Sequence, residues 1–508
     1  MRADLGQVLT PAPVADLVLS LALDGLPRGA RVLDPACGDG VFLARASARG
    51  AVAAGIEIDP ALAAAAAAHG DVRCGDFFAA APIEHDAVVG NPPYVRQERL
   101  GAGRRELATL AGAPARADLA LAFVLRALRF VKPGGRVAFV LSAAVLDADY
   151  GAALAGVGRV THVVASPRER WFADAAVHAV ILVIERGPPG PTACARLRVP
   201  VAEAAARVRR QADLGAVADV RTAGVGEAWA PLLRAPSVWL DVVGRAPLVP
   251  LGDLADLRRG ATSGANGFFY VPRGAPIEPR FLRPLLKTPK EAPAIRVSAA
   301  GLPLRAFVCP LDAAALRAFP GARAHVDAHR RLADRPTLRA RPRWWSLDVR
   351  PARLFLTKAY FTRFVQHLAA APVVADQRFY AVAPRRGVPV DLLAAALNGS
   401  LTALALESLG RASMGEGALE WSVGDAAGLP VIDPRRVDAA AVRRAFVRLA
   451  ARRAGDVFDD DPARAALDAA LLGPLADVAP AVRAGLRAAV SERLARSGAA
   501  PRPPPSFG

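Results

Sequence analysis

The residues best placed to do chemistry are Asn91-Pro92-Pro93-Tyr94, directly after a short apolar run. Each proline lacks an N–H and fixes its own φ, so the chain can continue neither as a helix nor as an interior strand and must turn at Asn91. The turn leaves two acceptors in a rigid corner, the Asn91 side-chain oxygen and the Pro92 carbonyl, with the Tyr94 ring beside them. Pro93 stiffens this corner.

Two such acceptors suit the methylation of an amino group. An exocyclic amino group is a poor nucleophile because its lone pair is conjugated. Acceptors aimed at its two hydrogens favour a pyramidal nitrogen and stabilise the charge that develops as a methyl group arrives. The alternative is an ordinary turn, which the position of this stretch at a strand end, after a cofactor half-site, disfavours. We therefore predict an amine-methylation site in which Tyr94 stacks on a planar substrate.

A second group of small residues lies in Leu33–Gly40, where a strand turns into a helix. Ala36, Gly38 and Gly40 allow backbone to approach a ligand closely. Neither GxxxxGK[ST] nor GxGxxG is present, and the carboxylate of Asp34 disfavours a pyrophosphate. Asp34 suits a ligand with a positive ammonium, such as the methionine part of S-adenosylmethionine.

Acidic residues also end the next two strands. Glu57, followed by Ile58, lies about twenty residues on, where a doubly wound sheet hydrogen-bonds ribose hydroxyls. Asp76 and Phe77 follow the third strand, where a carboxylate can accept from an adenine amino group and a ring can cover the adenine. Asp76 alone could equally be a helix N-cap. Because Asp34 and Glu57 also lie at the ends of successive strands, the cofactor-binding interpretation of Asp76 is favoured.

The elements that must position these residues alternate between strand and helix from 31 to 190. Short apolar runs at 86–91, 135–142 and 178–185 are typical of parallel strands buried on both faces. The pattern predicts an α/β fold with a doubly wound, mostly parallel sheet. We expect a catalytic domain over 1–240, a mixed α/β second domain over 245–435, and a helical carboxyl-terminal segment with a loose tail over 436–508.

The length and the charge of the chain indicate how many domains it has and what kind of partner it binds. The 508 residues suggest two or three domains, and 65 basic against 47 acidic residues give a net charge of +18. A GC-rich coding bias would explain arginine in place of lysine, but not the excess of bases. The simplest partner is a polyanion such as nucleic acid.

Several other classes of protein and site are disfavoured. No run of about eighteen residues lacks a charge and the amino terminus has no apolar core, so we expect a cytoplasmic chain without a membrane span. The four cysteines lack CxxC spacing, which argues against a zinc ribbon or a disulfide framework. His325 and His329 have metal-binding spacing but no third ligand nearby, and we expect an exposed helical face and no metal.

In the order of its motifs the chain resembles the gamma-class, TaqI-like N6-adenine DNA methyltransferases of restriction-modification systems. The resemblance is close over residues 6–186 and looser to about 435; the motifs are GQVLTP, VLDPACGDGVFL, GIEIDP, GDFF, GNPPY, RFVKPGGRVAFVLS and RWFADAAVHAVILVIERG. It implies that Thr10 and Pro11 close over the methionine part of S-adenosylmethionine. It also implies that Asp34 faces the ammonium, Glu57 holds the ribose, and Asp76 with Phe77 holds the cofactor adenine.

The resemblance further implies that Asn91, Pro92 and Tyr94 receive an adenine flipped out of double-stranded DNA, with Phe172 over its other face. Trp171 is the alternative stacking ring, although neighbouring side chains in a strand point opposite ways. The second domain would recognise the target through base edges in the major groove. A monomer is expected, with a cognate restriction endonuclease as a possible separate chain.

Two other functions stay open. One is an amino methyltransferase acting on RNA or on a protein glutamine, since both offer planar amino groups. The Thr10-Pro11 segment and the long region after the catalytic part count against it. The other is a non-catalytic DNA-binding subunit of a defence complex, against which stands the presence of every expected site residue.

Overall fold

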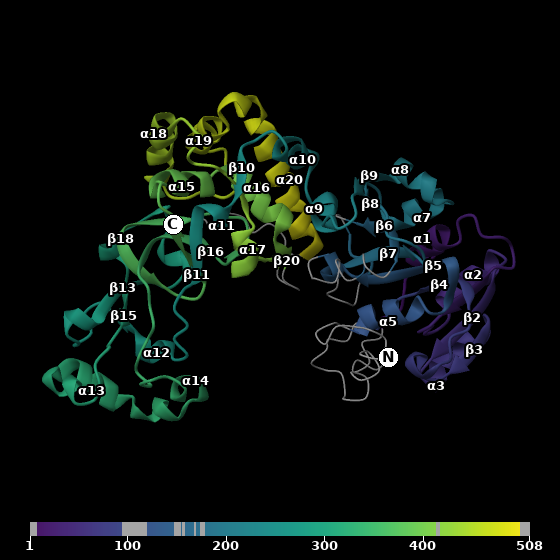
Figure 1. The fold of residues 1–508 in the computed structure, drawn as a ribbon, viewed down its shortest axis with the longest axis horizontal. Helices are drawn as coiled ribbons and strands as arrows, with labels where there is room; N and C mark the ends of the chain where they lie inside the picture. Colours follow the sequence, from purple (N-terminus) through teal and green to yellow (C-terminus); the bar gives the residue numbers. More distant parts are fainter. Residues whose placement is uncertain are drawn as a thin grey trace, which may run out of the picture. The chain divides into compact units, whose positions relative to one another are not determined.

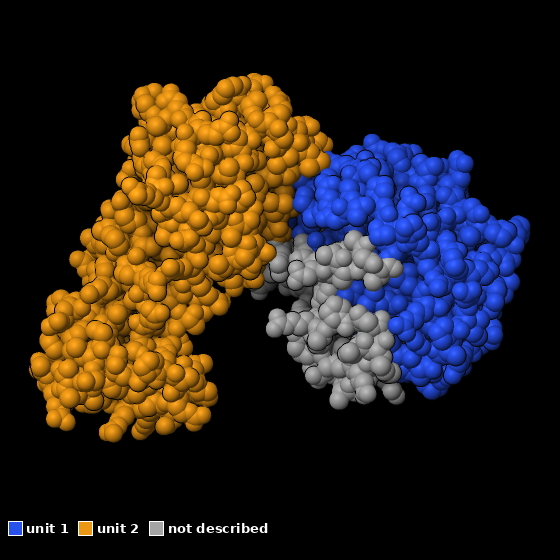
Figure 2. Space-filling model, viewed as in Figure 1, with its two compact units in different colours: residues 1–235, 414–416, 492–508 blue, residues 236–413, 417–491 orange. Residues whose placement is uncertain are grey.

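The computed structural model describes residues 8–93, 119–146, 154, 158–166, 169–172, 178–412 and 417–497. The chain forms two compact units (Figure 2): unit 1 comprises residues 1–235, 414–416 and 492–508, and unit 2 comprises 236–413 and 417–491. Unit 1 thus ends near the predicted end of the catalytic domain. Most of the carboxyl-terminal helical segment, which we expected to be separate, belongs to unit 2. The functions assigned to the domains stay predictions.

Unit 1 is built on a nine-stranded sheet in the order β3-β2-β1-β4-β5-β7-β6-β8-β9 (Figure 1). Strands β1 to β5 are parallel, β7 is antiparallel to β5 and β6, and β8 is parallel to β6. The predicted doubly wound, mostly parallel sheet is therefore confirmed. Its strands are β1 (Arg31–Asp34), β2 (Val52–Glu57), β3 (Asp71–Cys74), β4 (His85–Gly90), β5 (Val131–Ser142), β6 (Arg159–Ala165), β7 (Ala179–Glu185), β8 (Thr192–Leu197) and β9 (Ala218–Ala223).

Crossovers between parallel strands follow a right-handed rule, which places helices on both faces of this sheet. The β1-to-β2 and β4-to-β5 connections run in opposite directions along the sheet, which places their helices α2 and α5 on opposite faces. Helices α1, α2 and α7 share a hydrophobic core with the central strands. The helical segments are α1 (Ala12–Ala22), α2 (Val41–Ala48), α3 (Pro60–Ala66), η2 (Phe77–Ala79), α5 (Leu119–Ala127), η4 (Ala143–Leu146), α7 (Val201–Arg207), η5 (Gln211–Asp213), α8 (Leu214–Val217) and α9 (Trp229–Arg234).

The two helices beside the predicted cofactor site begin at sequence-specific turns. Gly40 precedes α2 at φ +90°, and a Cβ there would lie 3.0 Å from the Ala66 Cα, so only glycine fits. Asp59 caps α3 by accepting hydrogen bonds from the N–H groups of Ala61 and Leu62, and Pro60 occupies the first helical position. These turns bring the chain back to the sheet at the carboxyl ends of β1 and β2.

Unit 2 is mixed α/β, as predicted. Its main sheet runs β11-β19-β16-β18-β13-β15-β12 with β14 beside β18, and smaller sheets pair β10 with β22 and join β17, β21 and β20. The strands are β10 (Leu248–Pro250), β11 (Ala255–Arg259), β12 (Tyr270–Pro272), β13 (Leu282–Leu286), β14 (Arg296–Val297), β15 (Leu304–Phe307), β16 (Ala352–Thr357), β17 (Ala359–Tyr360), β18 (His367–Ala375), β19 (Phe379–Pro384), β20 (Arg411–Ala412), β21 (Leu419–Glu420) and β22 (Pro430–Ile432).

Helices surround these sheets at both ends of unit 2. Figure 1 shows α13 and α14 at one end of the unit and α18 and α19 near the other. The helical segments are α10 (Ser237–Val243), α11 (Leu251–Leu254), α12 (Asn266–Phe269), η6 (Pro279–Phe281), η7 (Pro289–Glu291), η8 (Ala299–Gly301), η9 (Ala315–Ala318), α13 (Pro320–Ala328), η10 (Arg330–Asp334), α14 (Pro336–Arg339), α15 (Val390–Leu397), α16 (Ser400–Leu409), α17 (Val423–Ala427), α18 (Ala439–Ala450), α19 (Pro462–Leu472), η11 (Gly473–Val478) and α20 (Ala479–Ser497).

By length and composition, one helical stretch of the described chain, Pro462–Ala495, is apolar enough to cross a membrane, and the bent pair α15–α16 would pass if counted as one span. The longer stretch is interrupted at Leu475, whose φ and ψ are −100° and 21°. It also contains Asp468, which is 3% exposed and accepts a hydrogen bond from the Ser400 N–H at 2.7 Å. These features are typical of a core helix, and the absence of a span stays a prediction.

Candidate active site

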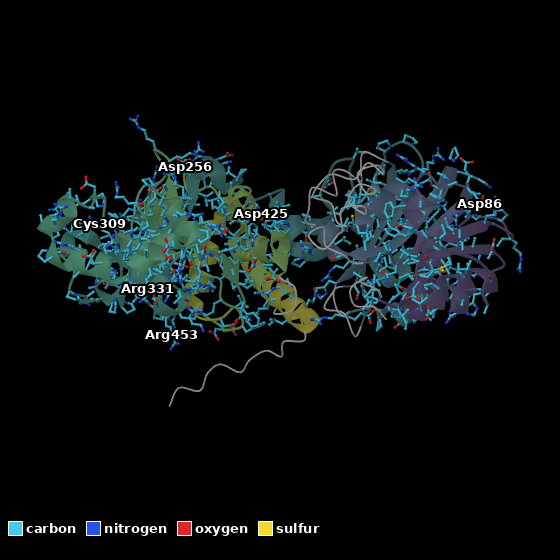
Figure 3. All side chains as sticks on the ribbon, turned by 90° about the horizontal axis from the view of Figure 1, so that it is seen from below. Asp86, Asp256, Cys309, Arg331, Asp425 and Arg453 are labelled. Atoms are coloured by element: carbon cyan, nitrogen blue, oxygen red, sulfur yellow. The ribbon has the colours of Figure 1, made fainter. Side chains whose placement is uncertain are left out.

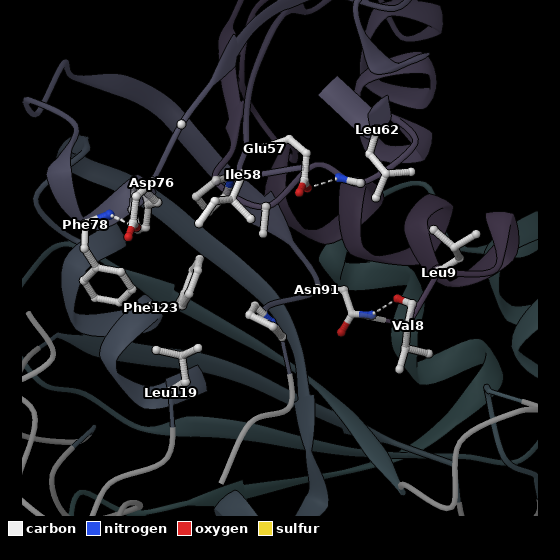
Figure 4. Close-up of a pocket in the computed structure, with 16 residues that line it drawn as sticks. Val8, Leu9, Glu57, Ile58, Leu62, Asp76, Phe78, Asn91, Leu119 and Phe123 are labelled. Atoms are coloured by element: carbon white, nitrogen blue, oxygen red, sulfur yellow. Dashed lines mark hydrogen bonds between the residues drawn. The ribbon is translucent and has the colours of Figure 1, made fainter. Parts of the chain in front are cut away.

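A pocket opens where strands β1 to β4 of unit 1 end, at the edge at which open α/β sheets bind ligands. Figure 4 shows its lining, which combines strand-end residues with the amino-terminal segment, η2 and α5. The lining residues are Val8, Leu9, Pro35, Ala36, Gly38, Glu57, Ile58, Leu62, Gly75, Asp76, Phe77, Phe78, Asn91, Pro93, Leu119 and Phe123. The structure thus brings together eight of the residues singled out from the sequence.

Glu57 joins two turns at the wall of this pocket. Its carboxylate is buried and accepts hydrogen bonds from the Gly38 N–H at 2.8 Å and from the Asp59 N–H at 2.9 Å. Each carboxylate oxygen has further lone pairs, so both bonds leave room for a ligand hydroxyl. The position at the end of β2 matches the one predicted for ribose binding.

Asp34 lies just behind the same turn and does not line the pocket. It is 1% exposed, its Oδ1 accepts from the Ala36 N–H at 3.0 Å, and a Cβ on Gly90 would come within 2.7 Å of that oxygen. The pKa of this carboxyl is raised to about 8, chiefly by burial and also by the negative charges of Glu57 and Asp39, while the hydrogen bond from Ala36 opposes the shift. A cation placed nearby would favour the ionised form and lower this pKa.

Asp76 caps a helical turn and also lines the pocket. It lines the pocket, and its Oδ1 caps η2 by accepting from the Phe78 N–H at 2.9 Å. Phe77 is 2% exposed and packs against the rings of Phe123 and Phe130, with centroids at 5.3 and 4.8 Å. Phe78 is only half-buried and also lines the pocket. The more accessible ring is therefore the neighbour of the one chosen from the sequence.

Asn91 has a fixed amide orientation. Its Nδ2 donates to the Val8 carbonyl oxygen at 3.1 Å, as Figure 4 shows. Because a carbonyl oxygen can only accept, the reverse orientation of the amide would lose this bond. Asn91 Oδ1 is buried and, within the described part of the chain, has no hydrogen-bond partner. An acceptor thus remains available in the corner predicted to receive an amino group.

Other predicted site residues lie outside the lining. Pro92 is buried beside Asn91, and Tyr94 falls outside the described residues. Thr10 and Pro11 follow the lining residues Val8 and Leu9 and lead into α1. Gly40 supports the turn before α2.

Phe172 and Trp171 are both buried in the core that α1 and α2 share with the sheet, at 2% and 6% exposure. Neither ring lines the pocket. The choice between them as the stacking ring therefore stays open.

Half of the lining residues are not among the predicted site residues, although five of them lie within the quoted motifs: Val8, Leu9, Pro35, Gly75 and Phe78. Phe78 adjoins a predicted residue, and its exposure follows from the 3₁₀ turn of η2. Leu119 and Phe123 lie four residues apart on α5, so the same face of one helix brings both to the pocket. The eight unpredicted lining residues are Val8, Leu9, Pro35, Leu62, Gly75, Phe78, Leu119 and Phe123.

The two histidines with metal-binding spacing are satisfied by other contacts. The Nε2 of His325 lies 2.9 Å from the Phe268 carbonyl oxygen, and its ring stacks on Phe268 with centroids 4.7 Å apart. His329 Nδ1 lies 2.9 Å from the His325 carbonyl oxygen. Both side chains are half-buried, so the predicted exposed face is wrong. No group of three or more metal-ligating side chains occurs among residues that the structure describes.

Comparison with known proteins finds similarity to methyltransferases. Residues 68–160 match the family of Eco57I restriction-modification methylases. The chain is 36% identical over 162 residues to the type II methyltransferase M.TthHB8I of Thermus thermophilus, which covers 28% of this chain and 36% of that protein. It is 30% identical over 297 residues to the type II methyltransferase M.XamI of Xanthomonas campestris pv. amaranthicola, with 52% of this chain and 53% of that protein covered.

A relative of another kind is the ribosomal RNA small subunit methyltransferase C of Chromohalobacter salexigens, 35% identical over 134 residues, with 25% of this chain and 35% of that protein covered. The chain spans about half or less of the length of these relatives. The match to the methylase family covers the segment that ends in Asn91-Pro92-Pro93 and continues beyond it. Residues 68–160 are therefore similar to a restriction-modification methylase family, and the similar proteins named here are all methyltransferases.

Proposed function

We propose that this chain is a DNA methyltransferase that moves a methyl group from S-adenosylmethionine to N6 of an adenine flipped out of double-stranded DNA. The observation that carries the proposal is the Asn91 amide, whose Nδ2 is held by Val8 while its buried Oδ1 has no partner among the described residues. A buried acceptor without a donor is costly, so a ligand donor at this place would recover free energy.

The donor set of the pocket fits S-adenosylmethionine. Glu57 would accept from ribose hydroxyls, and the Asp76 oxygen that does not cap η2 would accept from the adenine amino group. Ile58, Phe78 and Phe123 line the same pocket and offer apolar surface to a purine. Asp34 would compensate a positive charge through the turn at Ala36. When bound, the cofactor supplies an electrophilic methyl group.

The residues of the corner would act on the other substrate. Asn91 Oδ1 and the Pro92 carbonyl would each accept one N6 hydrogen, which draws the nitrogen lone pair out of conjugation. Neither residue needs to remove a proton before attack, since the proton can leave after transfer. The target must be extruded because a duplex hides the adenine amino group within the base stack.

Labelled S-adenosylmethionine tests the proposal directly. The chain is incubated with duplex DNA, RNA and protein in parallel, and modified nucleosides are identified after digestion. We expect label in N6-methyladenine of DNA. Label confined to RNA or to protein glutamine would instead support the amino methyltransferase alternative, which the similarity to a ribosomal RNA methyltransferase keeps as the second candidate. Duplex binding without transfer would indicate a non-catalytic subunit.

A further inference from the structure

The segment that follows helix α13 in unit 2 is strongly basic. Residues 329–343 contain six arginines and one acid, Asp334, a net charge of +5. Four of these arginines are exposed on η10 and α14; they are Arg330, Arg331, Arg335 and Arg339, and we call them the α14 arginine patch (Arg331 is labelled in Figure 3). Arg335 and Arg339 lie four residues apart at the two ends of α14, a spacing that places side chains on one side of a helix.

The patch lacks opposite charges. Within the described part of the chain, no carboxylate oxygen lies within 4.0 Å of a guanidinium nitrogen of these four arginines. Some other exposed arginines of unit 2 are paired, among them Arg323 with Asp327 at 3.5 Å and Arg443 with Asp391 at 2.6 Å. Clustered like charges repel, which is a cost unless a polyanion binds them.

The backbone under the patch is firmly held. Pro336 begins α14, and Leu338 is fully buried in the core beneath it. An Arg335 nitrogen donates to the Gly264 carbonyl oxygen at 3.3 Å. The preceding helix α13 is capped by Glu278, whose carboxylate oxygens accept from the N–H groups of Gly321 and Ala322, each at 2.8 Å. The arginines therefore project from fixed elements, which limits the ordering cost of binding.

Arg341, only two residues beyond the patch, has a different role. Its guanidinium donates to the carbonyl oxygens of Thr262, Ser263 and Ser346, at 3.0, 2.7 and 2.8 Å. It also lies over the Phe269 ring at 5.1 Å. These contacts use three of the five N–H donors of Arg341 within the fold, and the exposed arginines of this segment are the four of the patch.

We infer that the α14 arginine patch binds the phosphate backbone of duplex DNA. Guanidinium groups match phosphate oxygens in charge and in their forked geometry, and such contacts set the position of a protein on DNA without reading its sequence. The inference rests on the proposed function and adds to it the surface that holds the substrate.

The test uses the full chain and a mixed-sequence duplex of about 30 base pairs, because phosphate contacts do not require a recognition site. The variant is R330Q/R331Q/R339Q, which keeps Arg335 and its bond to Gly264. The matched control is R436Q/R444Q/R448Q, which removes the same charge from exposed positions on or just before α18, near the other end of unit 2 (Figure 1). Affinity is measured by fluorescence anisotropy between 50 and 200 mM salt.

We expect the patch variant to bind at least about tenfold more weakly, with a log–log salt slope reduced by about 2.7 if each arginine meets one phosphate. The control should stay close to wild type, and both variants should keep wild-type affinity for S-adenosylmethionine. The inference would be overturned if the patch variant kept the wild-type salt slope. It would also be overturned if the control variant lost as much affinity for duplex DNA as the patch variant. Either result would leave the proposed function intact. Patch-dependent binding of an RNA hairpin in preference to DNA would overturn it too. A wild-type chain that binds no duplex would instead contradict the proposed function.

Discussion

At the scale of single residues, two polar side chains in or next to the pocket, Asn91 and Asp34, are buried with incomplete hydrogen bonding or charge compensation. Asn91 has one end of its amide bound and the other end free, whereas Asp34 has one oxygen bound and no cation near it. Both arrangements are costly in a cofactor-free protein and become favourable with the proposed ligands. Each therefore leads to a measurable consequence.

Replacing Asn91 by Ala should reduce the methylation rate by about a hundredfold or more, the scale of losing one preorganised partner of the transition state. The affinity for S-adenosylmethionine should change little, because the proposed cofactor contacts lie on β2 and η2. Single-turnover rates and calorimetric titration of the cofactor measure the two quantities. Full turnover in a folded variant would refute the role of Asn91.

Replacing Asp34 by Asn should change the pH dependence of stability. The pKa of Asp34 is about 8 in the folded chain and near 3.8 when unfolded, so the folded state binds the extra proton. The contribution of Asp34 to the free energy of unfolding is fully present below the unfolded pKa. It is lost as the pH rises towards 8, by up to about 1.4 kcal/mol per pH unit. The Asn variant lacks this loss.

Urea unfolding without cofactor from pH 5 to pH 9 measures this difference. As the pH rises, the free energy of unfolding of the variant should increase relative to that of the wild type, and the difference should become constant above about pH 8. A constant difference across the range would mean that Asp34 is already ionised in the folded chain.

At the scale of elements, the turn η2 separates two neighbouring phenylalanines by burial. Phe77 enters the core against Phe123 and Phe130, and Phe78 remains half-buried at the pocket. A one-residue step along a 3₁₀ turn rotates the side chain by about 120°, so the two rings cannot share one role.

The variants Phe77→Ala and Phe78→Ala should therefore fail in different ways. Loss of the buried Phe77 ring should cost about 3 to 5 kcal/mol of stability. Loss of Phe78 should leave stability nearly unchanged and weaken S-adenosylmethionine binding by about three- to tenfold, as expected for one aromatic contact of about 0.5 to 1.5 kcal/mol. Thermal melts and cofactor titrations of both variants provide the comparison. The reverse pattern would mean that Phe77 contacts the cofactor and Phe78 supports the core.

Arg341 also acts at this scale, because its guanidinium binds the carbonyl oxygens of Thr262 and Ser263 in the loop between β11 and α12. Replacing Arg341 by Gln should lower the melting temperature of the chain, because up to three carbonyl bonds to a charged donor are lost, each contributing about 1.5 to 3 kcal/mol. The salt slope of DNA binding should stay at its wild-type value. A lowered slope with an unchanged melting temperature would instead place Arg341 at the DNA surface.

At the scale of the whole molecule, the excess of basic residues should dominate the affinity for nucleic acid. Each phosphate that an arginine neutralises releases counterions and contributes about −0.9 to the log–log slope of affinity against salt. With six or more such contacts, binding of duplex DNA should fall by about a thousandfold between 50 and 200 mM salt. Titrations at several salt concentrations measure the slope. A nearly flat line would mean that the charge of +18 serves something other than a polyanion.

Much of this protein follows from its sequence because the signals are local. Parallel strands end at the same edge of a sheet. Residues at the ends of successive strands, such as the acidic residues and the two prolines after Asn91, are therefore brought together by the order of the strands alone. The α/β class and the pocket position of Glu57, Asp76 and Asn91 followed from such signals.

What only the tertiary structure decided are contacts between segments far apart in the chain. The Val8 carbonyl that orients Asn91 lies 83 residues before it, and Phe123 reaches the pocket on a helix whose register no motif marks. Arg341 illustrates the same limit: an arginine among aromatics looks identical in sequence whether its donors meet phosphates or the carbonyl oxygens of a loop 78 residues away. Burial and partner choice depend on the packed surroundings of a side chain, which one-dimensional spacing does not contain.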